Sequence, residues 1–127
     1  MHKKIEEHIA ETATNFKRGT AEMLLLFLLK ERDWYAYELS KALKARSLEH
    51  FDIQGPSLYT ILYRLQDKGF VTTRDEQVGK RIRVYYHIAP AGEMYLDRIM
   101  AEYRSVTDGI SAVLLGTYTN HIQEGDA

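Results

Sequence analysis

The sequence predicts a mainly helical domain that carries one small β-hairpin. The segment 23–29 is apolar on nearly every side of a helix, as expected at the centre of a core. A later segment repeats apolar residues at the i, i+3, i+4, i+7 spacing of a buried helix face. These residues are Leu58, Ile61, Leu62 and Leu65. Two runs rich in β-branched and aromatic residues, 70–74 and 83–88, then flank a polar segment, which is typical of a hairpin.

Length and composition restrict the function classes. The 127 residues make one ordinary domain with enough chain for a real core. The chain has no cysteine, which excludes disulfides, thiol catalysis and cysteine zinc sites and fits a reducing compartment. No two histidines stand three or four positions apart, so no helical metal pair is expected. We expect no metal, no cofactor and no catalysis, because no phosphate loop or nucleophile motif is present.

No membrane segment is expected. The longest apolar run has seven residues, whereas a bilayer span needs about 18 or more. The first residues carry lysine and glutamate in place of the apolar core of a signal peptide. We therefore expect a cytoplasmic protein.

The charge is unevenly distributed along the chain. The net charge is −1, but residues 41–86 hold nine Lys and Arg against five Asp and Glu, a net of +4. The remaining residues carry −5. A local basic patch of this kind suits phosphates, although ordinary surface variation would explain it equally well.

Three helices are expected in the first half. Residues 3–16 place apolar side chains on one side of a short amphipathic helix. These side chains are Ile5, Ile9, Ala13 and Phe16. Thr20 is a suitable N-cap for the apolar helix 21–30. Trp34 leads into a third helix that ends near Arg46 and turns Leu39 and Leu43 inward.

The second half is expected to contain a helix, two strands and a long helix. After a connection at 47–54, the fourth helix opens at Gly55-Pro56-Ser57 and ends at Gly69. The strands 70–74 and 83–88 are expected to flank a loop at 75–82 with Gly79 as its turn residue. Pro90 begins a last helix that runs to Leu115, and a frayed tail follows.

The last helix carries an apolar seam with the 3, 4, 3, 4, 3 spacing of heptads. Its members are Leu96, Ile99, Tyr103, Val106, Ile110 and Val113. A domain of this size has little left to cover such a seam, so we expect it to pair with a second copy. The predicted organisation is an N-terminal helix at 1–17 packed on the dimerisation region, a binding domain at 18–89, and a dimerisation helix with its tail at 90–127.

Three helices followed by a hairpin is the order of a winged helix-turn-helix, whose last helix before the hairpin enters the major groove of DNA. The outer face of that helix is free of acids and is expected to contact double-stranded operator DNA through Ser57, Tyr59, Thr60, Tyr63 and Arg64. The wing would hold flanking DNA through Lys80, Arg81 and Arg83. The alternative for these cations is a solvated hairpin tip. Lys41 and Lys44 on the third helix are further candidates for phosphate contacts.

The sequence resembles the PadR family of transcriptional regulators from about Arg18 to Leu115. The resemblance rests on three motifs: Arg18-Gly19-Thr20-Ala21-Glu22 before the leucines, Ala36-Tyr37-Glu38-Leu39, and the block from Gly55 to Gly69. It implies a homodimeric repressor of the short-tailed subgroup, which binds a pseudo-palindromic operator and is released by a small aromatic effector. It also extends the DNA-binding set to Tyr37 and supports Tyr59 and the basic wing. The chain departs from the family pattern at Tyr35-Ala36, at Pro56 and Ser57, and in having no tryptophan in its last helix.

Two questions stay open at this stage. Four side chains could line an effector pocket, although packing is the more ordinary explanation of such aromatic and methionine stripes. These side chains are Trp34, Tyr95, Met100 and Tyr103. The alternative function is a winged-helix module that binds a protein without specific DNA binding.

Overall fold

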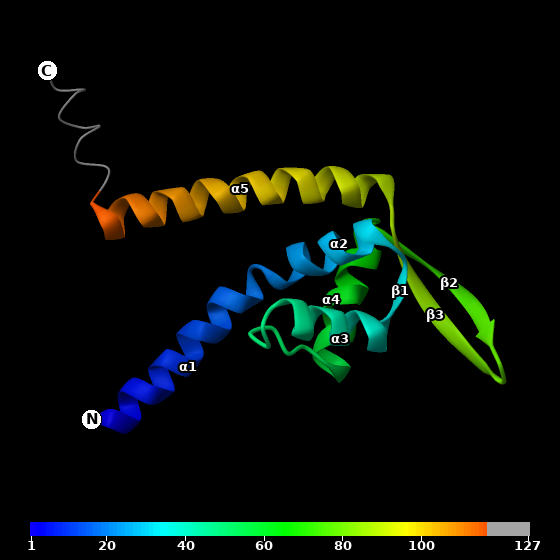
Figure 1. Ribbon diagram of the computed structural model, residues 1–127, viewed down its shortest axis with the longest axis horizontal. Helices are drawn as coiled ribbons and strands as arrows, with labels where there is room; N and C mark the ends of the chain where they lie inside the picture. The colour runs from blue at the N-terminus through cyan, green and yellow to red at the C-terminus, as the bar shows by residue number, and fades with distance from the viewer. Residues whose placement is uncertain (117–127) are drawn as a thin grey trace, which may run out of the picture. The chain divides into compact units, whose positions relative to one another are not determined.

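The computed structural model describes residues 1–116. Its elements follow the order α1 (His2–Arg18), α2 (Ala21–Glu31), β1 (Trp34–Tyr35), α3 (Ala36–Arg46), α4 (Gly55–Asp67), β2 (Val71–Val78), β3 (Arg81–Ile88) and α5 (Pro90–Leu115). Residues 1–96 form one compact unit, and residues 97–116 belong to a second. The first turns of α5 thus belong to the first unit. The mainly helical class with a small sheet is confirmed (Figure 1).

The core of the first unit is built around α2. Leu25, Leu26 and Leu29 of this helix are at most 1% exposed, which confirms its predicted central place. The remaining core side chains come from α3, α4, the sheet and the start of α5. They include Leu39, Leu43, Leu58, Leu62, Leu65, Val71, Tyr86, Ile88 and Leu96. Leu58, Leu62 and Leu65 of the apolar face predicted for the fourth helix are therefore buried, whereas Ile61 is only half-buried.

The hairpin is longer and its turn tighter than the sequence analysis expected. β2 and β3 pair antiparallel from Val71 with Ile88 to Val78 with Arg81, and only Gly79 and Lys80 remain between them. Gly79 has a φ of +64°, which suits the first position of a two-residue turn. The predicted loop at 75–82 is thus wrong. Its charged side chains lie at exposed positions of the two strands. The segment therefore lacks the alternation of apolar and polar residues that predicts a strand. Figure 1 shows the hairpin extending beyond the helices.

The sheet has a third strand that the sequence analysis missed. β1 pairs antiparallel with β3, Trp34 opposite Tyr86 and Tyr35 opposite Tyr85, so the strand order is β1-β3-β2. Two residues are too few for a periodic signal. The strand ties the start of α3 to the base of the hairpin.

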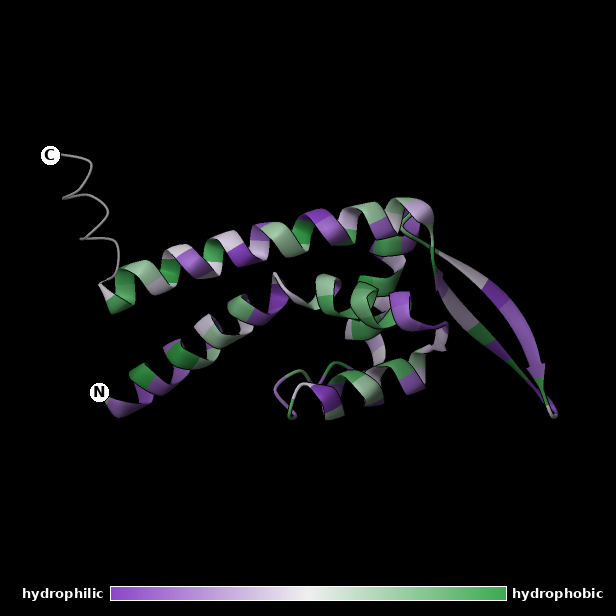
Figure 2. Cartoon of the chain, turned by 45° about the horizontal axis from the view of Figure 1, so that its top comes forward, coloured by the Kyte–Doolittle hydropathy of each residue, from purple (hydrophilic) through white to green (hydrophobic). Residues whose placement is uncertain are grey.

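The junction of α1 and α2 corrects one expected cap. The hydroxyl of Thr20 donates backward to the carbonyls of Phe16 and Lys17, at 3.2 Å each, and makes no cap hydrogen bond to α2. α1 itself has no buried residue. In Figure 2 hydrophobic and hydrophilic bands alternate along this helix, as expected of a helix with one apolar face.

Candidate nucleic-acid interface

The exposed face of α4 is aromatic and polar. Tyr59 and Tyr63 are 55% and 70% exposed, one helical turn apart, while the leucines of this helix point into the core. Thr60 lies between them and donates its hydroxyl to the carbonyl of Pro56 at 2.9 Å. The helix carries no carboxylate before Asp67. This face can therefore approach phosphates and base edges without electrostatic repulsion.

The start of α3 lies beside this face. Tyr37 is 64% exposed, and the Lys41 ammonium lies 5.2 Å from the centre of its ring. Tyr37 and Tyr59 line one hollow of about 280 Å³ together with Ile82, Val84 and other residues of α3 and the sheet. The hollow joins α3, α4 and the hairpin into one continuous surface. Lys44 is less available, since its ammonium lies 3.6 Å from the carboxylate of Asp52.

The cations of the wing lie at its turn and on strand β3. Lys80 is exposed at the turn, and Arg81 and Arg83 lie two residues apart on β3, on one face of the strand. The Arg83 guanidinium lies 4.4 Å from the ring centre of Tyr35. Arg81 and Arg83 also line a hollow with Tyr35 and Tyr37. The cations are thus held next to the aromatic surface.

An ionic cluster fixes the base of the wing. Asp33, in the link between α2 and β1, accepts from Arg74 of β2 and contacts Nδ1 of His87 on β3 at 2.7 Å. The Arg74 guanidinium also lies 5.0 Å from the ring centre of Tyr85. Partial burial opposes ionisation of Asp33, but the hydrogen bonds from His87 and Arg74 outweigh it and lower the pKa of this carboxyl. Asp33 thus links the segment before β1 to both strands of the hairpin.

Tyr86 lies beneath this surface. Burial, and secondarily the neighbouring Tyr59, raises the pKa of the Tyr86 phenol above its usual value. Tyr86 therefore stays neutral near pH 7 and can donate its hydroxyl proton.

Two residues predicted on the outer face of α4 lie to one side of it. The Arg64 guanidinium is 3.3 Å from the Glu22 carboxylate of α2, so its charge is engaged within the protein. Ser57 and Arg64 both line a separate hollow that faces α1 and α2. Tyr35, Ile82 and Val84 were missed as part of the surface, because their contribution depends on the unexpected strand β1 and the longer hairpin.

The predicted dimerisation residues differ in exposure. Leu96 is 1% exposed and belongs to the core of the first unit, so it cannot take part in a seam. Beyond it, Ile99 is partly exposed and the later members are exposed. The exposed fractions are 46% for Tyr103, 57% for Val106, 51% for Ile110 and 69% for Val113.

The four candidates for an effector pocket have separate surroundings. Trp34 donates its indole N–H to the carbonyl of Leu28 at 2.8 Å and lies under the Arg32 guanidinium, at 3.9 Å. Tyr95 stacks on Phe70 with ring centres 4.6 Å apart. Burial, and secondarily Glu22, raises the pKa of the Tyr95 phenol. Met100 and Tyr103 belong to the second unit. Trp34 and Tyr95 thus act as packing anchors in the first unit.

No helix within residues 1–116 is both long and apolar enough to cross a bilayer. The same part of the chain holds no cluster of three or more histidine and acidic side chains that could bind a metal ion.

Comparison with known proteins decides the family. Residues 25–98, more than half of the chain, match the transcriptional regulator PadR-like family. The chain belongs to this family. Members of the PadR-like family are transcriptional regulators, which implies a role in DNA-binding regulation.

Individual relatives agree with this assignment. A solved transcriptional regulator from Clostridium thermocellum is 29% identical, with a TM-score of 0.72, and the match covers 76% of this PadR-like chain and 95% of the other. A PadR family transcriptional regulator from Eggerthella lenta is 26% identical, with a TM-score of 0.78, over 87% and 96% of the two chains. An uncharacterized protein of Lysinibacillus sphaericus is 31% identical over 102 residues, which cover 78% of this chain and 92% of that protein.

Proposed function

We propose that the protein is a cytoplasmic, homodimeric repressor that binds a pseudo-palindromic operator. The observation that carries the proposal is the continuous surface formed by α3, α4 and the wing. Tyr59, Thr60 and Tyr63 would enter the major groove from α4. Ser57 would follow them at the first turn of the helix, whereas Arg64 would have to leave Glu22 to take part.

The flanking backbone would be held by residues outside α4. Tyr37 and Lys41 of α3 would contact phosphates beside the groove, and Lys44 would contribute less because of Asp52. Arg81 and Arg83 of the wing, with Lys80 at its tip, would contact the adjacent phosphates or the minor groove. These contacts would fix the register of the protein without specifying sequence.

The dimer would form through two exposed apolar stripes, one on α5 and one on α1. Ile99, Tyr103, Val106, Ile110 and Val113 form the stripe on α5. Ile5, Ile9 and Phe16, which are 50%, 57% and 74% exposed, form a second stripe on α1. A two-fold dimer would place its recognition helices about 34–36 Å apart, one turn of DNA. Occupancy of the operator would exclude polymerase, and a small effector would act by preferring a dimer with a different helix spacing.

Selection from a random-sequence duplex library tests the proposal. Wild-type protein should enrich an inverted repeat whose half-sites are centred about 10–10.5 base pairs apart, or a multiple of that distance. Enrichment of a single unrepeated motif would reject the dimeric arrangement. Absence of any enriched motif would reject sequence-specific binding and favour a module that binds a protein.

A further inference from the structure

The buried side chain of Tyr86 reaches the hollow that α3, α4 and the hairpin share. The residue is only 8% exposed, and it lines this hollow of about 280 Å³ together with Tyr37 and Tyr59. Within residues 1–116 the Tyr86 hydroxyl makes no hydrogen bond, and no fully enclosed side-chain oxygen or nitrogen lacks a partner. The Tyr86 oxygen is therefore open to the hollow, where it can donate to a bound group.

Phenols from three elements meet at this hollow. Tyr37 at the start of α3 and Tyr59 on α4 are largely exposed and form its rim, while the buried Tyr86 of β3 lies beneath them. Burial, and secondarily the neighbouring Tyr59, raises the pKa of the Tyr86 phenol, so this group stays uncharged at neutral pH. Uncharged hydroxyl donors of this kind suit an anionic oxygen.

The wing side of the hollow is apolar. Ile82 and Val84 of β3 are 70% and 42% exposed, and both line the hollow. They alternate along the strand with Arg81 and Arg83, so the two kinds of side chain project to opposite faces of the hairpin. Arg83 still borders the hollow, with its guanidinium 4.4 Å from the ring centre of Tyr35. The hollow thus combines a cation with an apolar wall that the fold leaves largely uncovered.

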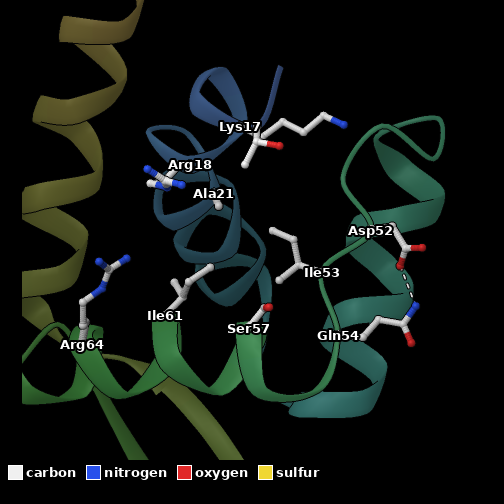
Figure 3. Close-up of a pocket in the computed structure, with 10 residues that line it drawn as sticks. Lys17, Arg18, Ala21, Asp52, Ile53, Gln54, Ser57, Ile61 and Arg64 are labelled. Carbon is white, nitrogen blue, oxygen red and sulfur yellow. Dashed lines mark hydrogen bonds between the residues drawn. The ribbon is translucent and has the colours of Figure 1, made fainter. Parts of the chain in front are cut away.

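The other side of α4 does not contribute to this hollow. Figure 3 shows Ser57, Ile61 and Arg64 projecting from α4 toward α1 and α2, where they line a separate hollow. The Arg64 guanidinium is paired there with the Glu22 carboxylate at 3.3 Å. Arg83 therefore supplies the positive charge beside the phenols.

A sugar–phosphate unit of DNA has the chemistry that matches these groups. Its phosphate carries a negative charge and free acceptor oxygens, which suit hydroxyl and guanidinium donors. Its deoxyribose lacks the 2′-hydroxyl of RNA and presents carbon atoms in that place, which suit an apolar wall. In a winged helix-turn-helix, a helix in the major groove and a wing on its flank have a stretch of DNA backbone between them.

We propose that the hollow holds one sugar–phosphate unit of the DNA backbone between α4 and the wing. Tyr59 and Tyr86 donate to the phosphate oxygens, and Arg83 supplies the opposite charge. Ile82 and Val84 pack on the deoxyribose. The proposal rests on the proposed function, and it makes the buried Tyr86 a direct DNA contact rather than a residue of the core alone.

Fluorescence anisotropy with a duplex of random sequence at low salt tests the phenol, because a backbone contact is independent of base sequence. Tyr86→Phe keeps the ring and removes the hydroxyl, and it should weaken binding about tenfold for each copy bound. The matched control is Tyr85→Phe, which removes a hydroxyl from the next residue of β3. Its ring packs against Tyr35 and Arg74 instead, so this variant should bind as wild type does. Equal affinity of the two variants would overturn the proposal.

The salt dependence separates a direct contact from a displaced wing. The slope of log K against log salt should be the same for Tyr86→Phe and wild type, since an uncharged phenol releases no counterion from DNA. A slope that falls by about one unit would show that the variant has moved Arg81 or Arg83 away from the DNA. That result would overturn the assignment of a direct contact to Tyr86.

The apolar wall is tested at Ile82, which is too exposed to matter for folding. Ile82→Thr keeps a β-branched side chain and should weaken binding to the same duplex about threefold, with an unchanged salt slope. Val78→Thr is the matched control. Val78 lies opposite Arg81 and therefore on the other face of the hairpin, so this variant should bind as wild type does. Equal binding by both variants would contradict the contact with deoxyribose.

The outcomes distinguish the site from the proposed function. Binding of random duplex that depends on Tyr86, without an enriched motif in the library selection, would support the site and reject sequence-specific regulation. An enriched motif that wild type and Tyr86→Phe bind equally well would support the function and overturn the site. Failure of wild type to bind any duplex would reject both.

Discussion

At the scale of single residues, the proposed DNA surface combines two kinds of group. Its cations attract a duplex of any sequence, whereas its aromatic and hydroxyl groups can recognise the base sequence. Arg81 belongs to the first kind, and Thr60 and Tyr63 belong to the second. The two kinds lie on different elements, the wing and α4. Their contributions are therefore separable by mutation.

Replacing Arg81 should weaken binding to all sequences by a similar factor. Arg81→Ala removes about one phosphate contact, so the slope of log K against log salt should fall by about one unit. Thr60→Val and Tyr63→Phe remove hydroxyl groups from the side of α4 that we propose faces the groove, and should change the order of preferred sequences. Fluorescence anisotropy over several duplexes and salt concentrations measures both effects. Lys4→Ala, on α1, is the control. If both classes of variant changed affinity in the same way, the assignment of direct readout to α4 would be wrong.

The connection between α3 and α4 holds two consecutive exposed residues, Leu48 and Glu49, at positive φ. Leu48 has a φ of +54° and is 80% exposed, so its side chain gains little from packing. Leu48→Gly should raise the free energy of unfolding by about 0.5–1 kcal/mol, because glycine adopts this conformation without steric cost. Leu48→Ala keeps the Cβ atom and should bring no such gain. Urea denaturation distinguishes the two variants, and equal stability of both would show that the strain is absent.

At the scale of elements, the hydrophobic pattern predicted the core well. The leucines of α2 and α4 lie where their spacing placed them, since burial of apolar side chains dominates folding. The hairpin was predicted, but its length and the strand β1 were not. Exposed charged strands and a two-residue strand leave no periodic signal.

The candidate site was predicted only in part from the sequence. A helical wheel placed Tyr59 and Tyr63 on the exposed side of α4, and the structure agrees. The wheel could not show that Arg64 meets Glu22, because that pair depends on how α2 crosses α4. The hollow shared by Tyr37, Tyr59 and the wing also depends on tertiary packing.

The start of α5 packs against the link between α4 and β2 so closely that only glycine fits. A Cβ atom on Gly92 would lie 2.1 Å from the backbone oxygen of Phe70, which accepts a hydrogen bond from the amide of Ala89 at 2.9 Å. Gly92→Ala should therefore destabilise the fold by about 2–4 kcal/mol. Gly19→Ala is the control, because nothing lies within 4 Å of its added Cβ atom. Thermal unfolding of the two variants checks the prediction, which fails if their melting temperatures agree.

The ionic cluster at the base of the wing predicts a dependence of stability on pH. The folded state lowers the pKa of Asp33, so its contribution is present above the ordinary carboxyl range near 4 and is lost as the pH falls through the folded value. Asp33→Asn should cost about 1–2 kcal/mol at pH 7, and this difference should shrink below pH 4. The control Asp75→Asn removes the same charge from β2. Denaturation curves at pH 7 and pH 3 measure the change, and a constant difference between wild type and Asp33→Asn would contradict the account.

At the scale of the whole molecule, the proposed function depends on a second copy of the chain. Val106 is 57% exposed in the middle of the α5 stripe. Val106→Asp should dissociate the dimer and weaken operator binding, because a charge in an apolar interface is left without solvation. Ser105→Asp introduces the same charge one residue away, off the stripe, and should leave the dimer intact. Analytical ultracentrifugation reports the oligomeric state. A fully dimeric Val106→Asp protein would refute the seam.

The central claim is that α3, α4 and the wing form one DNA-reading surface. Its most direct test is fluorescence anisotropy of the full chain with the duplex upstream of its own gene, titrated with salt and with unlabelled random duplex. The account predicts binding that resists the random competitor and falls steeply as salt rises. Flat anisotropy at low salt, or binding that random duplex displaces at equal concentration, would contradict it.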